Sequence, residues 1–272
     1  NAGDVRWTQE GLQQGGFYFP TLLHEFGHGH GLAHPHDNGG RSSVMPGSDD
    51  GSVIGGGLAD FELSQQVFTI MSYNDGWATS PYGQPRSGGV TGLEVDHYGW
   101  MGSLAPFDIA VLQDKYGVNE EWARGNDVYE LKDVNGPGTF YAAIWDAAGI
   151  DEIRYTGAAD ANLDLRAATL QYEPGGGGWV SYATGIHGGF VIANGVTIEN
   201  ATSGSGNDTL TGNEAANALS SGSGNDILVG AGGGDTLNGG GGADQLRGGA
   251  GDDLLIGLNG ADRFYFDGDF GH

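Results

Sequence analysis

The apolar pattern of the C-terminal part of the chain repeats every nine residues. From residue 203 onward, an apolar side chain occupies the eighth position of each nonapeptide and a polar side chain the sixth. The apolar residues are Leu210, Leu219, Leu228, Leu237, Leu246, Leu255 and Phe264, and the polar residues are Asp208, Asn217, Asp226, Asp235, Asp244, Asp253 and Asp262. A period of nine is typical of a parallel β-roll, in which short strands and Gly-rich turns alternate between two sheets. A flexible Gly linker has no need of the apolar position, so the pattern favours the roll.

The Gly-rich turns of this repeat predict calcium sites. Glycine permits a tight turn whose carbonyls face an ion, and the Asp supplies an ionised oxygen. Because successive strands belong to opposite sheets, turns on one side recur every 18 residues. The ions are therefore expected between Asp208 and Asp226, Asp226 and Asp244, Asp244 and Asp262, Asn217 and Asp235, and Asp235 and Asp253. The residues expected to supply ligands in these turns are Gly204, Gly206, Asp208, Asn213, Ala215, Asn217, Gly222, Gly224, Asp226, Gly233, Asp235, Gly240, Gly242, Asp244, Gly249, Gly251, Asp253 and Asp262.

A helix near the N-terminus carries two histidines on one face. Pro20 is tolerated only in the first turn of a helix, so the pattern predicts a helix that begins within residues 18–21 and ends at residue 30. His24 and His28 are four residues apart, which directs both imidazoles to one side of this helix. Their nitrogens can therefore converge on one point.

The residues around this helix complete a zinc-binding pattern. Gly31 allows the chain to leave the helix in a left-handed conformation, after which His34 can return to the same point. Three imidazoles with a water in the fourth position form a catalytic zinc site. Glu25 lies beside His24 and can face that water without being a ligand, which suits a general base. The alternative is a site of this shape that holds no metal.

Two further histidines lie close to this pattern. His30 is expected to be either partly exposed or a neighbour of the ligands. His36 is expected at the surface or beside the site rather than as a ligand.

A second helix marks the end of the N-terminal part. Pro106 opens an amphipathic stretch at residues 107–116, and Gly117 stops it. We expect a domain boundary near residue 118, followed by a strand-rich, less regular segment at residues 119–200.

Composition and charge narrow the function further. The chain of 272 residues holds 55 Gly, 35 Asp and Glu against 10 Lys and Arg, and no Cys, for a formal charge of −25. Such a surface repels nucleic acid and anionic membranes. The acids either solvate the surface or bind cations, and the repeats favour cations. No apolar run approaches 18 residues, so no membrane span is expected.

The zinc pattern and a later methionine turn together resemble one protease family. Residues 24–34 match the metzincin signature, and residues 69–73, Thr-Ile-Met-Ser-Tyr, are similar to the Met-Ser-Tyr turn of the serralysins, secreted bacterial metalloproteases. The resemblance implies that Met71 is a structural floor beneath the histidines. It implies that Tyr73 is a further zinc ligand that swings away and stabilises the oxyanion. Gly31 is structural in the same pattern.

The same resemblance implies calcium loops between the two helices and the repeats. Residues 123–127, 146–151 and 197–199 are similar to serralysin calcium loops. The expected ligands in them are Ala123, Gly125, Asp127, Asp146, Ala148, Gly149, Asp151, Thr197 and Glu199. Residues 3–7 resemble the edge strand above the serralysin cleft.

These observations predict a fold and a function. The expected fold is an α+β metzincin catalytic portion at residues 1–118 that lacks most of its N-terminal sheet. A connecting β segment at residues 119–200 starts the roll, and an all-β parallel β-roll that binds calcium occupies residues 201–272. Serralysins carry well over a hundred residues before the zinc helix, so the chain is expected to be a fragment, a processed form or a shortened relative.

The expected function is that of a secreted zinc endopeptidase with one Zn²⁺, several Ca²⁺ and type I-like export. The alternative is a calcium-dependent extracellular interaction module with an inactive or incomplete zinc site. The resemblance implies protein or peptide substrates and allows a proteinaceous inhibitor as a partner. Neither nucleic acid nor a membrane span is expected.

Overall fold

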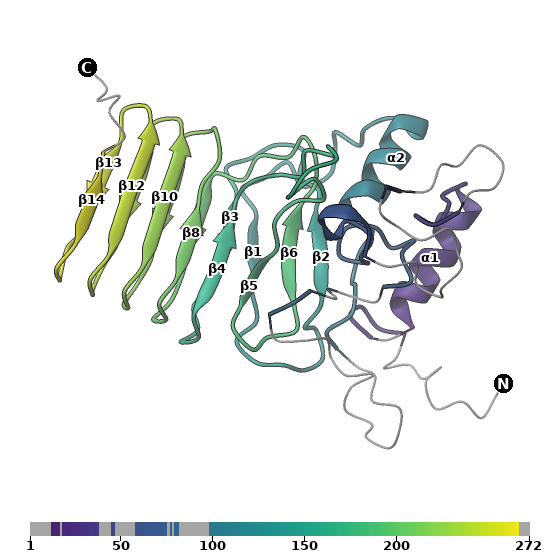
Figure 1. Ribbon diagram of the computed structural model, residues 1–272, viewed down its shortest axis with the longest axis horizontal. Helices are drawn as coiled ribbons and strands as arrows, with labels where there is room; N and C mark the ends of the chain where they lie inside the picture. The colour runs from purple at the N-terminus through teal and green to yellow at the C-terminus, as the bar shows by residue number, and fades with distance from the viewer. Residues whose placement is uncertain are drawn as a thin grey trace.

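The molecule consists of a long β-roll with a small helical part at one end (Figure 1). The computed structural model describes residues 12–16, 18–37, 45, 46, 58–74, 77, 79–81 and 98–266. Its helices are α1 (Phe19–Gly29), the short 3-10 helix η1 (Asp60–Glu62) and α2 (Pro106–Tyr116). Its strands are β1 (Val128–Glu130), β2 (Tyr141–Ile144), β3 (Glu152–Arg154), β4 (Ala161–Asp164), β5 (Ser181–Ala183), β6 (Gly189–Ile192), β7 (Asn200–Thr202), β8 (Thr209–Thr211), β9 (Ala218–Ser220), β10 (Ile227–Gly232), β11 (Thr236–Asn238), β12 (Gln245–Ala250), β13 (Leu254–Ile256) and β14 (Arg263–Tyr265).

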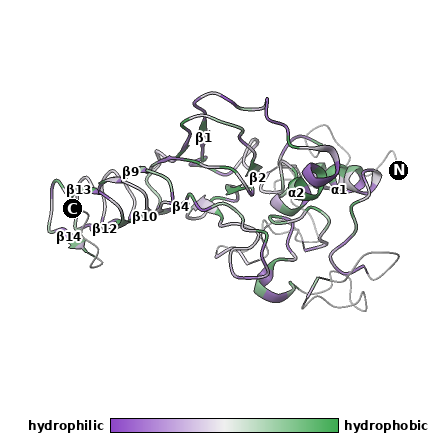
Figure 2. Ribbon diagram, turned by 90° about the horizontal axis from the view of Figure 1, so that it is seen from above, coloured by the Kyte–Doolittle hydropathy of each residue, from purple (hydrophilic) through white to green (hydrophobic). Residues whose placement is uncertain are grey.

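Successive strands of the repeat alternate between two sheets. One sheet has the order β1-β3-β7-β9-β11-β13, and the other has the order β14-β12-β10-β8-β4-β5-β6-β2. Neighbouring strands of the repeat are parallel and 18 residues apart, so that Leu228 pairs with both Leu210 and Leu246. The chain thus winds around one axis, as the view from above shows (Figure 2). The predicted parallel β-roll is confirmed.

The apolar eighth position fills the interior of the roll except at its end. Leu210, Leu219, Leu228, Leu237 and Leu246 are at most 1% exposed and form one core cluster. Phe264, in contrast, is 41% exposed. This side chain lies on β14, an outermost strand of its sheet, and no further strand among the described residues covers it.

The roll begins well before the regular repeats. Strands β1, β3 and β7 lie in the same sheet as β9, β11 and β13. In the other sheet, β5 is antiparallel to both β4 and β6, which interrupts the parallel winding. Residues 119–200 are therefore strand-rich and less regular, and both sheets continue across residue 200 without a break.

Both helices begin and end within one residue of the predicted positions. Proline stands in the first turn of each, and α2 ends at Gly117, which has φ +89°. They pack around a second core that contains Ile70, Met71 and Met101. A bridge between Met101 and Tyr141 joins this core to β2 of the roll. The helical part is thereby fixed to the end of the roll.

Some predictions lie outside the described residues. The expected edge strand at residues 3–7 is one of them. Within the described part of the chain, no helix has the length and apolarity needed to cross a bilayer.

Candidate zinc and calcium sites

Helix α1 carries a glycine because a methionine packs directly against it. A Cβ at Gly27 would lie 2.7 Å from Met71 Sδ and 3.2 Å from Leu32 Cδ1. Met71 is 1% exposed and lies on the turn at residues 69–73. The absence of a side chain at Gly27 thus lets the methionine turn approach the helix closely, next to the three histidines.

The structure brings the three predicted zinc ligands together. His34 Nε2 lies 3.1 Å from His24 Nε2 and 3.0 Å from His28 Nε2. Gly31 has φ +88°, the left-handed conformation that lets the chain turn back after α1. Two turns of one helix and a following loop therefore present three ring nitrogens to a single point.

A hydrogen bond at Nδ1 fixes the tautomer of each imidazole. His24 Nδ1 lies 2.9 Å from the Ile70 carbonyl oxygen, and His28 Nδ1 lies 3.0 Å from the Leu32 carbonyl oxygen. His34 Nδ1 lies 2.9 Å from Asp37 Oδ2. Carbonyl and carboxylate oxygens only accept hydrogen bonds, so each Nδ1 carries the proton and each neutral ring has a bare lone pair on Nε2. Three lone pairs aimed at one point repel one another unless a cation lies between them.

Distance and charge both fit zinc. A tetrahedral zinc ion with bonds of about 2.0–2.1 Å to nitrogen holds its ligands about 3.3 Å apart, close to the spacing seen here. Burial holds the pKa of His34 below its ordinary value in spite of the nearby Asp37 carboxylate, and this favours the neutral imidazole that a metal requires. The Nε2 cluster is therefore a candidate zinc site.

Tyr73 and Glu25 lie beside this cluster. The Tyr73 ring centroid is 4.6 Å from that of His34 and 5.5 Å from that of His24, so the phenol borders the convergence point. Burial, followed by the charges of Asp37 and Glu25, raises the pKa of Tyr73. The hydroxyl thus keeps its proton at neutral pH, and the Glu25 side chain is exposed to solvent.

Asp37 is a functional candidate that the sequence analysis did not single out. Its Oδ2 accepts hydrogen bonds from both the backbone N–H and Nδ1 of His34. Such an outer carboxylate orients a ligating imidazole and raises its basicity. Its position three residues after the third histidine is the sequence feature that could have indicated this role.

The two remaining histidines of this region lie outside the cluster. The His36 ring stacks on that of His34 at 5.1 Å. His30 lies at the far side of the helix end, with Nδ1 3.2 Å from the Tyr116 hydroxyl.

A second group of oxygens forms where the three predicted calcium loops meet. Carboxylate oxygens of Asp127, Asp146 and Asp151 lie within 4.8 Å of one another. The Asp151 N–H donates to Glu199 Oε2 at 2.8 Å, which brings a fourth carboxylate to the group. Burial, together with the neighbouring Asp146 and Glu199 charges, raises the pKa of Asp151. The position of Gly149 is tight, because a Cβ there would lie 1.8 Å from the Gly125 carbonyl oxygen.

The turn carboxylates of the repeats point inward along both sides of the roll. The Asp226 N–H donates to Asp244 Oδ1 at 2.9 Å, and the Asp235 N–H donates to Asp253 Oδ1 at 2.9 Å. Among the described residues, no group donates a hydrogen bond to the second oxygen of Asp235 or of Asp244, although both oxygens are buried. Burial raises the pKa of Asp235 to about 6, with a further contribution from Asp253. Buried, unpaired carboxylate oxygens fit a calcium ion, which takes six to eight oxygen ligands.

Glycines allow close approach of the backbone and of the turn carboxylates. A Cβ at Gly242 would lie 1.6 Å from the Gly224 carbonyl oxygen of the preceding turn. A Cβ at Gly230, in β10, would lie 2.1 Å from Asp235 Oδ2.

One turn differs from the others. Asn213 Nδ2 donates to the carbonyl oxygens of Leu165 and Ile198, and Asn217 Nδ2 donates to that of Glu199. In this turn the side-chain amides donate hydrogen bonds to backbone carbonyls, and Asn217 stands where the other repeats carry an Asp carboxylate. Predicted ligands Asn213, Ala215 and Asn217 therefore lie in a turn held by hydrogen bonds.

The repeats match a known family. Residues 202–237, 229–264 and 238–271 match the model of the RTX calcium-binding nonapeptide repeat. These ranges cover the regular part of the roll from β8 onward, which therefore matches calcium-binding repeats.

Proteases related to this chain extend across both parts of the structure. A serralysin of Photorhabdus laumondii is 32% identical over 80% of this chain and 42% of the relative. A serralysin of Proteus mirabilis is 34% identical over 73% of this chain and 36% of the relative, and serralysin C of Dickeya chrysanthemi is 36% identical over 70% and 35%. The chain thus spans about two fifths of the length of these relatives. It is a relative of the serralysin-type metalloproteases that carries RTX calcium-binding repeats.

Proposed function

We propose that this chain is the zinc-binding and calcium-binding part of a secreted endopeptidase that hydrolyses peptide bonds in proteins. The convergence of the three Nε2 atoms of His24, His28 and His34 is the observation that carries the proposal, and Glu25 follows His24 directly in α1. The names of the relatives support it, although the chain spans only part of their length. The metzincin portion at residues 1–118, the roll after it and the individual ligands belong to the same proposal.

Each residue of the site has a chemical role in this function. His24, His28 and His34 would hold a zinc ion, which would supply a Lewis acid for the scissile carbonyl. Glu25 accepts a proton from the attacking water and delivers it to the leaving amine. The Tyr73 hydroxyl donates a hydrogen bond to the developing oxyanion.

Calcium organises the second part of the molecule. The turn carboxylates of the roll, with the group around Asp151, hold several Ca²⁺ ions whose charge compensates the repulsion between like-charged side chains. Calcium is scarce in the cytosol and abundant outside the cell, so this linkage suits a protein that folds after type I-like export. Protein or peptide substrates follow from the proposed activity.

Casein digestion tests the proposal with calcium kept in excess throughout. Digestion should disappear with a zinc-selective chelator and return when zinc is added. Glu25→Gln should retain zinc while turnover falls roughly 10²-fold or more, because only the general base is lost. Tyr73→Phe should lower kcat with little change in KM, since its hydroxyl acts mainly in the transition state.

Two matched histidine variants separate the site from its surroundings. His34→Ala should lose bound zinc, whereas His30→Gln should keep both zinc and activity because His30 faces Tyr116. If the parent binds zinc and calcium but cleaves no protein, the chain is instead a calcium-dependent extracellular interaction module with an inactive site. Glu25→Gln turnover equal to that of the parent would refute the catalytic assignment.

A further inference from the structure

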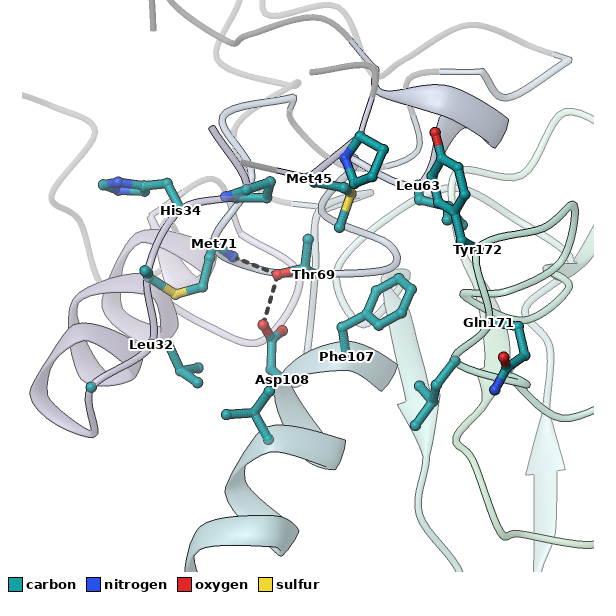
Figure 3. A pocket seen from close by; sticks show the side chains of 16 residues that line it. Leu32, His34, Met45, Leu63, Thr69, Met71, Phe107, Asp108, Gln171 and Tyr172 are labelled. Atoms are coloured by element: carbon teal, nitrogen blue, oxygen red, sulfur yellow. Dashed lines mark hydrogen bonds between the residues drawn. The ribbon is translucent and has the colours of Figure 1, made fainter. Parts of the chain in front are cut away.

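A buried carboxylate stands at the junction of the methionine turn and helix α2. Asp108 is 2% exposed and belongs to the first turn of α2. Oδ1 accepts a hydrogen bond from the Thr69 hydroxyl at 2.8 Å (Figure 3). Oδ2 accepts from the Ile70 N–H at 2.7 Å and from the Ala105 N–H at 3.0 Å. One side chain therefore holds the start of a helix and the turn that precedes Met71.

The hydrogen bonds continue from this turn to a zinc ligand. Asp108 holds Ile70 by its N–H, and the carbonyl oxygen of the same residue accepts the Nδ1 proton of His24 at 2.9 Å. The Thr69 hydroxyl oxygen also accepts from the Met71 N–H at 3.3 Å (Figure 3). Only one residue separates the carboxylate from the imidazole, and Ile70 is itself completely buried.

We propose that Asp108 is a positioning residue that fixes the Ile70 carbonyl and thereby the orientation and tautomer of the zinc ligand His24. The side chain does not reach the Nε2 cluster, and it acts through Ile70. Charge-assisted hydrogen bonds are about twice as strong as neutral ones, so the negative charge tightens the grip on the turn. A firmly held outer acceptor keeps the imidazole lone pair aimed at the metal.

The burial of Asp108 argues against a purely structural role. Burial raises the pKa of Asp108 to about 6, and the hydrogen bonds from Ile70, Thr69 and Ala105 only partly oppose this rise. An ionised Asp108 is therefore costly to the folded state at neutral pH. A costly charge that holds the turn beside the candidate zinc ligands points to a demand on geometry rather than on stability.

The substitution Asp108→Asn tests this role without changing the shape of the side chain. Its amide oxygen can still accept from both backbone N–H groups, but the charge is lost and the Thr69 hydroxyl loses its acceptor. We expect zinc to dissociate about tenfold more readily, as measured in competition with a chromophoric chelator at saturating calcium. The visible spectrum of the Co²⁺-substituted protein should change, because the ligand field at His24 changes. Asp114→Asn removes an exposed charge from the same helix and should leave both measurements unchanged.

The readouts distinguish positioning from folding. We expect the melting temperature of the zinc-free Asp108→Asn protein to equal or exceed that of the parent at pH 7.5. A zinc affinity within twofold of the parent with an unchanged Co²⁺ spectrum would overturn the proposal, and so would a fall in affinity matched by a fall in zinc-free stability. For Asp108→Asn we also expect a lower kcat with unchanged KM, and this expectation rests on the proposed endopeptidase function. The zinc and Co²⁺ measurements do not, so an inactive parent would refute the enzyme while leaving the role of Asp108 decided by metal binding.

Discussion

The two glycines inside α1 should respond in opposite ways to replacement by alanine. A Cβ at Gly29 meets no atom within 4 Å, whereas a Cβ at Gly27 lies 2.7 Å from Met71 Sδ and 3.2 Å from Leu32 Cδ1. Both residues belong to the same helix and are two positions apart. They therefore form a matched pair in which helix propensity is shared and only packing differs.

The size of each effect follows from these contacts. Gly29→Ala should stabilise the protein by roughly 0.5–1 kcal/mol, the usual gain of alanine over glycine in a helix. Gly27→Ala gains the same propensity but overpacks a close contact, which typically costs about 1–3 kcal/mol. The net result is destabilisation, and the two variants should differ by roughly 2 kcal/mol. Displacement of Met71 should also weaken zinc binding in Gly27→Ala alone.

Thermal unfolding followed by circular dichroism at 222 nm, at fixed calcium and zinc, measures the pair. A difference of this size corresponds to a melting-temperature gap of about 4–8 °C for a chain of this length. Equal melting temperatures would refute the packing argument, and so would a Gly27→Ala protein more stable than Gly29→Ala.

Three further predictions concern the ions and charges. Chelation of calcium in the full chain should abolish most of the β-sheet circular dichroism signal, and added calcium should restore the signal. The reason is that buried carboxylates such as Asp235 and Asp244 lose their counter-charge when calcium is removed. An unchanged spectrum would contradict the proposed sites. Lys115→Met should lower the free energy of unfolding by about 0.5 kcal/mol, because Lys115 Nζ donates a hydrogen bond to the His30 carbonyl oxygen at the C-terminus of α1. An unchanged free energy of unfolding at low ionic strength would show that this interaction does not stabilise the helix end. Ionisation of Asp108 should lower the free energy of unfolding by roughly 2 kcal/mol as pH rises from about 4 to 7, because the pKa of Asp108 is raised from 3.8 to about 6 in the folded state, which therefore holds its proton to a higher pH than the unfolded chain does. Urea unfolding of the parent and of Asp108→Asn at pH 5 and 7.5 should show a stability difference that moves in favour of Asp108→Asn at the higher pH, and a difference that does not change with pH would refute this mechanism.

Features determined by local pattern were predictable from the sequence. Pro20 and Pro106 set the starts of the helices and Gly117 the end of α2, because each acts through its own backbone. The register of the roll follows from its period, since a strand two repeats later must present the same face. The period does not predict burial at the end of the roll: Phe264 occupies the apolar position of its repeat but is exposed, because burial requires a neighbouring strand on both sides.

Features determined by contacts between distant residues were not predictable. Gly27 lowers the intrinsic stability of the helix, and the reason for a glycine at this position is its contact with Met71, which lies 44 positions later in the chain. Asp108 reads as an ordinary acidic residue in the first turn of a helix, where it favours the dipole. Its bonds to Thr69 and Ile70 require the methionine turn to fold back onto α2.

The geometry of the zinc site combines both kinds of information. Spacing along the chain brings His24, His28 and His34 near one point, but spacing alone does not decide which nitrogen of each ring faces inward. That choice is made by three acceptors: a carbonyl on the methionine turn, a carbonyl after the helix and the Asp37 carboxylate. Since each acceptor binds Nδ1–H, all three rings present Nε2, and the site is prepared for a cation before one arrives. The sequence pattern therefore specifies the candidate ligands, while the surrounding fold specifies their protonation.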